Sequence, residues 1–394
     1  MEVPIINKAE YSIYGNLKDY PRIPDPAPLG SYTANDVIFL LKDIGPYIKE
    51  QGNEERERAV QSGKHYSEML PIEYKPSREY IDLFHKSLKD TVYRLATATA
   101  IVSETIIKKR GKNVVLVSLA RAGTPVGVLI KRYIHRFYGV NMPHYSISII
   151  RDKGIDKNAM IYLLQRHPGC EIQFIDGWTG KGVITMELFK SVLDFERQLG
   201  MNENTICKDI AVLADPGYCA NIFGTRDDFL IPSACLNSTV SGLMSRTVCR
   251  TDLIGTLDFH GAKYYRELLD EDLSNYFVDA VDKCFVEVYR NALRILQDNP
   301  DIGVDRHPAW IGKKETHKIQ MKFGIKNISY VKPGVGETTR VLLRRVPWKI
   351  LVKCAKNPDI KHIQLLAEDR GVPVEEYPNI NYSCYGLIKT MEEM

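Results

Sequence analysis

Residues 114–125 read VVLVSLARAGTP, and residues 172–182 read IQFIDGWTGKG. Each stretch begins with an apolar run typical of a buried parallel strand and continues into a loop rich in glycine and small residues. A helical pattern follows each loop, and further strand patterns at 145–150 and 210–214 continue the alternation. This alternation predicts an α/β domain with a largely parallel sheet. Ligands of such sheets bind at the carboxyl ends of the strands, so we expect the chemistry in these loops.

The predicted domain organisation follows the apolar patterns and the loops between them. Helical spacing over residues 36–44 and 79–109 precedes the first strand pattern. After the main domain, a polar stretch rich in glycine and proline leads to a second alternation of strands and helices. The predicted parts are an N-terminal arm and helical extension packed on the main domain (1–70), the main domain (71–300), a linker (301–313) and a second α/β domain (314–394).

Charge is distributed unevenly along the 394 residues. The chain has 53 basic and 49 acidic residues, and a net charge of +4 does not by itself indicate a nucleic-acid-binding protein. Residues 314–394, however, hold 14 basic and 9 acidic residues, so the excess lies in the second domain. That is where the electrostatic footprint of a nucleic-acid partner would be expected.

Several classes of protein are excluded by what the sequence lacks. It has no apolar run of about 18 residues and no signal-peptide pattern, so no membrane association is expected. Eight cysteines without a C-x-x-C pair indicate free thiols in a reducing compartment, and we therefore expect a cytoplasmic protein. The H-E-x-x-H, G-x-S-x-G and P-loop motifs are absent, and no metal-ligand set stands out.

The first two strand-end loops have the residue types of a phosphate site. Small residues around Gly123 let backbone N–H groups approach an anion, and the guanidinium of Arg121 can pair with phosphate. In the second loop, Asp176 can accept hydrogen bonds from vicinal hydroxyls, and Thr179 to Gly182 offer hydroxyl, backbone and ammonium donors. The alternatives are an ordinary tight turn with a surface arginine, and a helix N-cap at Thr179 with a solvated Lys181.

Together these loops resemble those of the type I phosphoribosyltransferases, which implies their Rossmann-like parallel sheet and a phosphoribosyl transfer reaction with Mg²⁺. By that resemblance, Asp176, Arg121 and Arg151 are the expected catalytic residues, with the arginines on pyrophosphate and Asp176 on the ribose. The expected phosphoribosyl pyrophosphate site comprises Ser118, Arg121, Ala122, Gly123, Thr124, Asp176, Gly177, Thr179, Gly180, Lys181 and Gly182.

A third polar segment, residues 215–247, is dense in hydroxyl, amide and charged side chains. Such a segment suits recognition of a polar or nucleobase-like acceptor, and the alternative is a capped surface loop. The expected acceptor-binding residues are Asp215, Arg226, Asn237, Ser241 and Arg246.

In the second domain, residues 334–340 read GVGETTR and resemble the contact loop of the Pelota-type RNA-binding fold. The resemblance implies RNA as a partner, with Glu337 accepting from a base and Lys332 and Arg340 meeting phosphate. The alternative is that Glu337 is simply an acid at a helix start. The expected RNA-binding residues are Lys332, Gly334, Gly336, Glu337, Thr338 and Arg340.

The overall layout resembles a bacterial family of tellurite-resistance and stress gene clusters, in which a phosphoribosyltransferase-like domain is joined to a Pelota-type domain. Our main prediction is therefore a transferase that uses phosphoribosyl pyrophosphate. Family members also carry the label cysteine protease StiP, and that alternative would make Cys219 or Cys235 the nucleophile and His260 its base. A non-catalytic nucleotide-sensing and RNA-binding module is the third alternative, and a homodimer is left open.

Overall fold

The computed structural model describes residues 15–52, 55–56, 58–59, 62–345 and 347–388. Its main sheet has the order β1-β6-β5-β8-β9-β10, and all neighbours on this path are parallel. A short strand, β7 (Gly154–Ile155), pairs antiparallel with β6. The path strands are β1 (Ile38–Leu40), β6 (His144–Ile150), β5 (Val114–Ala120), β8 (Glu171–Trp178), β9 (Ile210–Ala214) and β10 (Ile222–Thr225). The predicted α/β class with a mostly parallel sheet is therefore confirmed.

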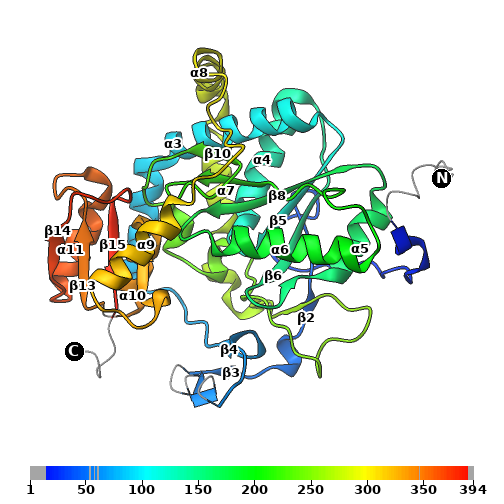
Figure 1. Ribbon diagram of the computed structural model, residues 1–394, viewed down its shortest axis with the longest axis horizontal. Helices are drawn as coiled ribbons and strands as arrows, with labels where there is room; N and C mark the ends of the chain where they lie inside the picture. The colour runs from blue at the N-terminus through cyan, green and yellow to red at the C-terminus, as the bar shows by residue number, and fades with distance from the viewer. Residues whose placement is uncertain (1–14, 53–54, 57, 60–61, 346, 389–394) are drawn as a thin grey trace.

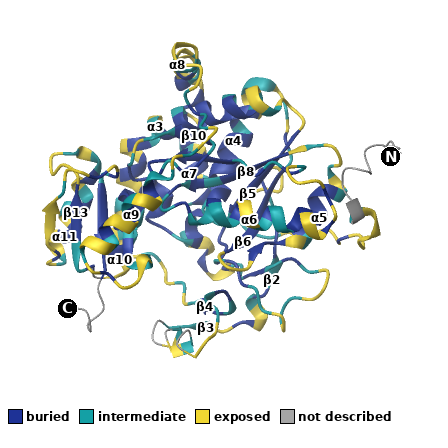
Figure 2. Cartoon of the chain, in the orientation of Figure 1, coloured by how far each residue is buried: buried dark blue, intermediate teal, exposed yellow. Residues whose placement is uncertain are grey.

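Helices cover both faces of the main sheet because successive side chains of its strands point to opposite sides. Val114 and Leu116 of β5 belong to one apolar cluster, whereas Val115 and Val117 belong to the other. The strands are accordingly buried at the centre of the molecule (Figure 2). The first face carries α3 (Arg78–Arg110), α4 (Gly123–Tyr138), α7 (Ser274–Asp282) and α8 (Phe285–Asp298), and the second carries α5 (Lys157–Arg166) and α6 (Val183–Gln198).

A second, smaller sheet has the order β12-β15-β13-β14 and lies at one end of the molecule (Figure 1). Its strands are β12 (Val331–Pro333), β15 (Cys384–Leu387), β13 (Lys349–Val352) and β14 (Val374–Glu376). Three helices pack with it: α9 (Ile311–Lys322), α10 (Val335–Arg344) and α11 (Lys361–Asp369). Residues of α10 and α11 join the apolar cluster of the main domain, so the two units share a continuous core.

Asp228 fixes the second unit to the first. Its carboxylate accepts the backbone N–H groups of Val335, at 2.9 Å, and of Ser383, at 2.8 Å. Tyr382 adds a hydrogen bond of 2.7 Å from its hydroxyl to the carbonyl of Gly180. The start of α10 is thereby held against the strand-end loops of the main sheet.

Two local features differ from the sequence prediction. Residues 36–44 do not form the predicted helix: Ile38–Leu40 is β1, because the run of Ile38, Phe39 and Leu40 pairs with β6 at the edge of the sheet. Helix α9 begins at Ile311, inside the predicted linker. Residues 1–14 of the predicted arm and residues 389–394 of the second domain lie outside the described residues. In the described part of the chain, no helix combines the length and apolar character needed to cross a membrane.

Candidate functional site

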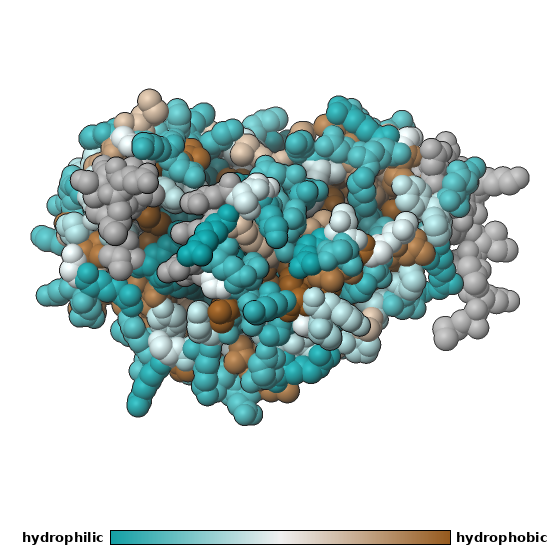
Figure 3. All heavy atoms as spheres, turned by 90° about the horizontal axis from the view of Figure 1, so that it is seen from below, coloured by the Kyte–Doolittle hydropathy of each residue, from teal (hydrophilic) through white to brown (hydrophobic). Residues whose placement is uncertain are grey.

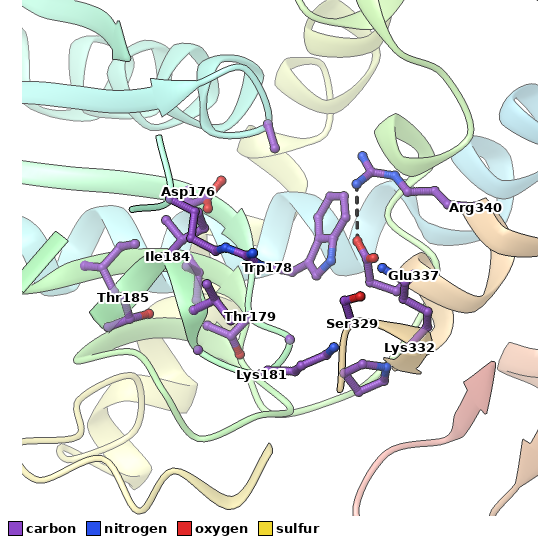
Figure 4. Close-up of a pocket in the computed structure, with 18 residues that line it drawn as sticks. Asp176, Trp178, Thr179, Lys181, Ile184, Thr185, Ser329, Lys332, Glu337 and Arg340 are labelled. Carbon is purple, nitrogen blue, oxygen red and sulfur yellow. Dashed lines mark hydrogen bonds and ion pairs between the residues drawn. The ribbon is translucent and has the colours of Figure 1, made fainter. Parts of the chain in front are cut away.

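Two separate regions in the described part of the chain each combine a cavity with several charged side chains, and one of them also includes a cysteine. The first is a cavity of about 350 Å³ between the carboxyl ends of the main strands and the second domain (Figure 4). It is lined by many of the residues predicted from the sequence, which are Ala122, Arg151, Asp176, Thr179, Gly180, Lys181, Gly182, Lys332, Glu337 and Arg340. Arg121 and Asn237 line an adjoining cavity of about 270 Å³ that shares Ala122, Asp176 and Arg340 with the first.

Burial changes the pKa values of the charged groups in this interdomain cavity. It raises the pKa of Asp176 to about 6, against the opposing effects of the Gly177 N–H group and Arg340. Burial and then the ammonium of Lys332 lower the pKa of Lys181 to about 7. The pKa of Lys332 is lowered as well, again chiefly by burial. The cavity thus holds cationic groups that are poorly solvated and repel each other.

Other predicted residues of the phosphate loops lie beneath the cavity surface. Ser118 is fully buried, and its hydroxyl hydrogen bonds His144 at 2.7 Å. The hydroxyl of Thr124 is paired with that of Ser146 at 2.8 Å. Gly123 packs against the backbone of β8, where an added Cβ would lie 2.4 Å from the carbonyl oxygen of Ile175. These residues therefore shape the turn rather than face the cavity.

The predicted acceptor-binding residues are mostly engaged in holding loops together. Asp215 accepts hydrogen bonds from the hydroxyl of Thr179 and the N–H of Cys219, and it pairs with Arg226. The guanidinium of Arg246 donates to the carbonyls of Tyr66 and Met69. The hydroxyl of Ser241 donates to the carbonyl of Asn237 at 2.7 Å. Only Asn237 of this set lines a described cavity.

The predicted RNA-contact loop faces the main domain. Gly334 and Gly336 lie against Asp228 and Trp178, respectively. Thr338 is fully buried, and its hydroxyl donates to the carbonyl of Lys332 at 3.4 Å. Arg340 lies over the ring of Trp178 at 4.8 Å and donates to the carbonyl of Ala234 at 3.2 Å. What remains open to a ligand here is the interdomain cavity, lined by Lys332, Glu337 and Arg340.

Neither cysteine predicted as a nucleophile has an activated environment. Both Cys219 and Cys235 are fully buried. Burial raises the pKa of Cys235 to about 12, and burial with the nearby Asp215 carboxylate raises that of Cys219 further. The thiol of Cys219 donates to the carbonyl of Gly217 at 3.1 Å. These thiols stay neutral, whereas a cysteine nucleophile must be a thiolate.

The second place is the pair formed by Cys249 and His260. Val248 and Gly261 form an antiparallel bridge and exchange backbone hydrogen bonds of 2.8 and 2.9 Å. The register of that bridge places Cys249 directly opposite His260, at a non-hydrogen-bonded position, where cross-strand side chains are closest. The chain around Cys249 is fixed further by its own N–H group, which donates to the carbonyl of Ser67 at 2.9 Å.

The pair has the electrostatics of a thiolate and an imidazolium. The hydrogen bond from His260 is the main cause that lowers the pKa of Cys249, and the charge of Lys153 acts in the same direction. Burial alone would lower the pKa of His260, but the bond to Cys249 and the charge of Asp156 outweigh burial and raise it. Both shifts favour transfer of the thiol proton to the imidazole.

Two buried residues orient His260. Nδ1 of its ring hydrogen bonds the hydroxyl of Ser148 at 2.9 Å. Its backbone N–H donates to the carboxylate of Asp156 at 2.5 Å. Asp156 also caps α5 through the N–H of Ala159 at 3.2 Å, so the histidine is tied to the start of a helix.

Cys249 lines a cavity of about 370 Å³ together with Lys49, Lys64, Lys153 and Arg250. The cavity lies beside β3 (Glu50–Gln51) and β4 (Leu70–Pro71), which pair with each other. β3 and β4 lie on the lower side of the molecule in Figure 1. Figure 3 views the molecule from below and shows that this side is mostly hydrophilic. Cys249 is partly exposed and lines this cavity.

Sequence reasoning named His260 but missed Cys249. No local motif surrounds Cys249, and its partner is eleven residues away. The segment between them could have indicated a turn, because residues 251–258 contain Gly255 and polar residues that favour turns. A hairpin reading of residues 248–261 would have set Cys249 opposite His260.

Among the described residues, no group of three or more His, Cys, Asp or Glu side chains is arranged to hold a metal ion. Magnesium was expected only as the partner of pyrophosphate, and it stays an untested prediction.

Comparisons with known proteins decide between the predicted functions. Residues 30–282 match the family model described as "Tellurite-like stress resistance cysteine protease StiP". Residues 310–390 match the model of the "PELOTA RNA binding domain". A curated relative from Acinetobacter baylyi (strain ATCC 33305 / BD413 / ADP1), named "Cysteine protease StiP", is 33% identical over 357 residues, which is 88% of this chain and 90% of the relative.

These matches overturn our main prediction. A phosphoribosyltransferase, with its transferase chemistry and its pyrophosphate-bearing substrate, is wrong as the leading function, because the family model and the relative are both named as cysteine proteases. The predicted link to tellurite-like stress resistance and the predicted Pelota-type domain are confirmed. The chain belongs to the StiP family of tellurite-like stress resistance cysteine proteases, and it carries a Pelota-type RNA-binding domain at its C-terminal end.

Proposed function

We propose that this chain is a cysteine protease in which Cys249 is the nucleophile and His260 is the base. The single observation that carries the proposal is the cross-strand pair itself. Of the cysteines considered, Cys249 has a lowered pKa and lines a cavity, whereas Cys219 and Cys235 are buried and neutral. The family name supports this class of reaction, and the cross-strand geometry supports this choice of residues.

The proposed reaction follows from the thiolate–imidazolium pair. The Cys249 thiolate attacks the carbonyl carbon of a peptide bond, and a carbon–sulfur bond forms. The His260 imidazolium gives its proton to the departing amine as the carbon–nitrogen bond breaks, which leaves a thioester on Cys249. His260, now neutral, takes a proton from water, and the resulting hydroxide attacks the thioester and releases the carboxylic acid. Ser148 holds the imidazole in the required orientation throughout.

The charges around Cys249 favour an acidic substrate. Of the two acids that line its cavity, Asp252 is paired with Arg250 at 2.5 Å. Lys49, Lys64 and Lys153 have no acidic partner within salt-bridge distance in the described part of the chain. A peptide with Asp or Glu beside its scissile bond would be attracted to these ammonium groups.

Hydrolysis of a denatured-protein and peptide-library panel, followed by mass spectrometry, tests the proposal. We expect cleavage by the wild-type chain, loss of cleavage in Cys249→Ala, and unchanged cleavage in Cys235→Ser. Cleavage that survives in Cys249→Ala would overturn the assignment of the nucleophile. The thermal midpoint of each variant shows whether a loss of activity reflects unfolding.

We also propose that the C-terminal domain binds RNA. The match to the Pelota RNA-binding model and the excess of basic residues in 314–394 support this.

All eight cysteines lie in the described part of the chain and are unpaired, which fits a reducing compartment and supports the predicted cytoplasmic location.

A further inference from the structure

The cavity between the two domains is not used by the protease proposal, although it concentrates charge. Arg151 and Lys181 reach it from the main domain, and Lys332 and Arg340 reach it from the second domain. Figure 4 shows Lys181 and Lys332 extending toward the same space from the two sides. Among the described residues, only Asp176 and Glu337 contribute acids to its lining. Cations therefore outnumber acids in a partly enclosed space, and an anion placed there would relieve their repulsion.

The two lysines are the cations of the cavity with the fewest partners, because Arg151 pairs with Asp152 at 3.1 Å. Glu337 pairs with Arg340 at 3.4 Å, and Arg340 is also committed to Trp178 and Ala234. The ammonium of Lys332, by contrast, has no hydrogen-bond or ion-pair partner among residues 15–52, 55–56, 58–59, 62–345 and 347–388. Within the described part of the chain, the ammonium of Lys181 donates only to the carbonyl of Ile328, at 2.5 Å. Burial is the main cause that lowers the pKa values of both lysines, so their ammonium groups are also poorly solvated.

We infer that this interdomain cavity binds the phosphate backbone of a single strand of RNA, and that Lys181 of the main domain acts there together with Lys332 of the C-terminal domain. The inference rests on the RNA binding proposed above and adds a contribution from outside the Pelota-type domain. A cavity of about 350 Å³ admits a phosphate and its sugar but is too small for a duplex. One face of Trp178 is covered by Arg340, so recognition is of the backbone rather than by stacking of bases on that face.

The test is fluorescence anisotropy of a labelled oligouridylate with the full chain, measured over a range of salt concentrations. We expect Lys181→Gln and Lys332→Gln each to weaken binding several-fold. Each lost phosphate contact should flatten the slope of log K against log salt by about 0.7. Lys190→Gln is the matched control, because Lys190 is an exposed lysine on α6 that does not line the cavity. An oligocytidylate should bind about as well as the oligouridylate, since the bases are not read.

Two results would overturn the inference in different ways. If wild-type protein binds the oligouridylate and Lys181→Gln binds it equally well with the same salt slope, RNA binding stands but the main domain has no part in it. If neither oligonucleotide binds and uridine monophosphate alone raises the thermal midpoint, the cavity takes a small phosphate ester, and the RNA proposal fails as well. Thermal midpoints of the variants near that of wild type exclude unfolding as the cause of lost binding.

Discussion

Cys249 and His260 face each other across an antiparallel bridge, and the bridge rather than a local motif brings them together. Val248 and Gly261 supply its two backbone hydrogen bonds. On the other side, the carbonyl of His260 accepts the N–H of Lys42 at 3.0 Å, so the histidine lies on a segment held from both sides. A rigid strand segment of this kind keeps a base within reach of a thiol without help from a loop.

The first prediction concerns His260→Ala. In wild type the hydrogen bond from His260 lowers the pKa of Cys249, so the thiolate forms at lower pH than in an ordinary cysteine. Removing the imidazole should shift the rise in alkylation rate toward higher pH. Peptide hydrolysis should fall roughly 10²–10⁴-fold, the usual contribution of a general acid–base group. An alkylation profile identical to that of wild type would contradict the pairing.

Activity should therefore show a bell-shaped dependence on pH. Activity rises with pH as Cys249 loses its proton, at a pH below the ordinary pKa range of cysteine. It falls again as His260 loses its proton, at a pH above the ordinary histidine pKa of 6.5. The measurement is kcat/KM against pH. A single sigmoid that rises only above about pH 8.5, the range of an unperturbed thiol, would argue against an ion pair.

Ser148→Ala should affect the orientation of His260 but not the fold. The change removes one hydrogen bond to Nδ1, worth about 1 kcal/mol, so kcat should fall about 3–10-fold while KM stays constant. Because Ser148 acts through His260, the pH limit set by the imidazole should move as well. Ser146→Ala, on the same strand but bonded to Thr124, is the control for a buried hydroxyl, and it should leave the pH profile unchanged.

Lys153→Glu should reverse the preference for acidic peptides. Lys153 lines the Cys249 cavity and lowers the pKa of the thiol, so the carboxylate would repel Asp or Glu in a substrate and favour Lys or Arg. Competition between acidic and basic peptides of equal length measures the ratio of kcat/KM values. Lys157→Glu changes an exposed charge at the start of α5, outside the cavity, and should leave the ratio as in wild type.

Asp228→Ala should loosen the contact between the domains. It leaves the N–H groups of Val335 and Ser383 without their acceptor, at a cost of about 2–4 kcal/mol in the free energy of unfolding. Burial raises the pKa of Asp228 to about 7 from 3.8, so the unfolded chain releases this proton first as pH rises. The protonated Asp228 carboxyl therefore contributes its full share to the free energy of unfolding below about pH 4, and this contribution is lost as pH rises through 7.

Urea unfolding between pH 4 and 7 measures both effects. Wild type should lose stability across this range, and Asp228→Ala should show a smaller slope. Asp227→Ala is the control, because Asp227 is an exposed neighbour that pairs with Arg94 at 3.2 Å. An Asp228→Ala variant as stable as Asp227→Ala would mean that the carboxylate does not hold the domains together.

The main sheet was predictable because its strands are short apolar runs that end in glycine-rich loops. The helix predicted over 79–109 is present as α3. Residues 36–44 misled the prediction, because the apolar run of β1 fits a helix as well as a buried edge strand, and only pairing with β6 decides between them.

The sequence allowed the individual residues of the interdomain cavity to be predicted, but not their arrangement around it. Asp176 and Lys181 follow a strand that can be recognised in the sequence, and Lys332 precedes a recognisable loop. Nothing local places Lys332 opposite Lys181, because Asp228 and Tyr382 make that contact over long sequence separations. Cys249 differs, because the bridge that brings it to His260 closes a short segment of the chain, but composition alone does not distinguish it from the other thiols.

The measurement that tests the central claim most directly is competitive alkylation of all eight cysteines with limiting iodoacetamide at about pH 6, where an unperturbed thiol is almost wholly protonated. Peptide mapping then gives the extent of modification at each site. We predict that Cys249 is modified first, ahead of the more exposed Cys354, and that His260→Ala removes this lead. Modification of Cys249 no faster than of Cys354, or earlier modification of Cys219 or Cys235, would contradict the assignment of Cys249 as the nucleophile.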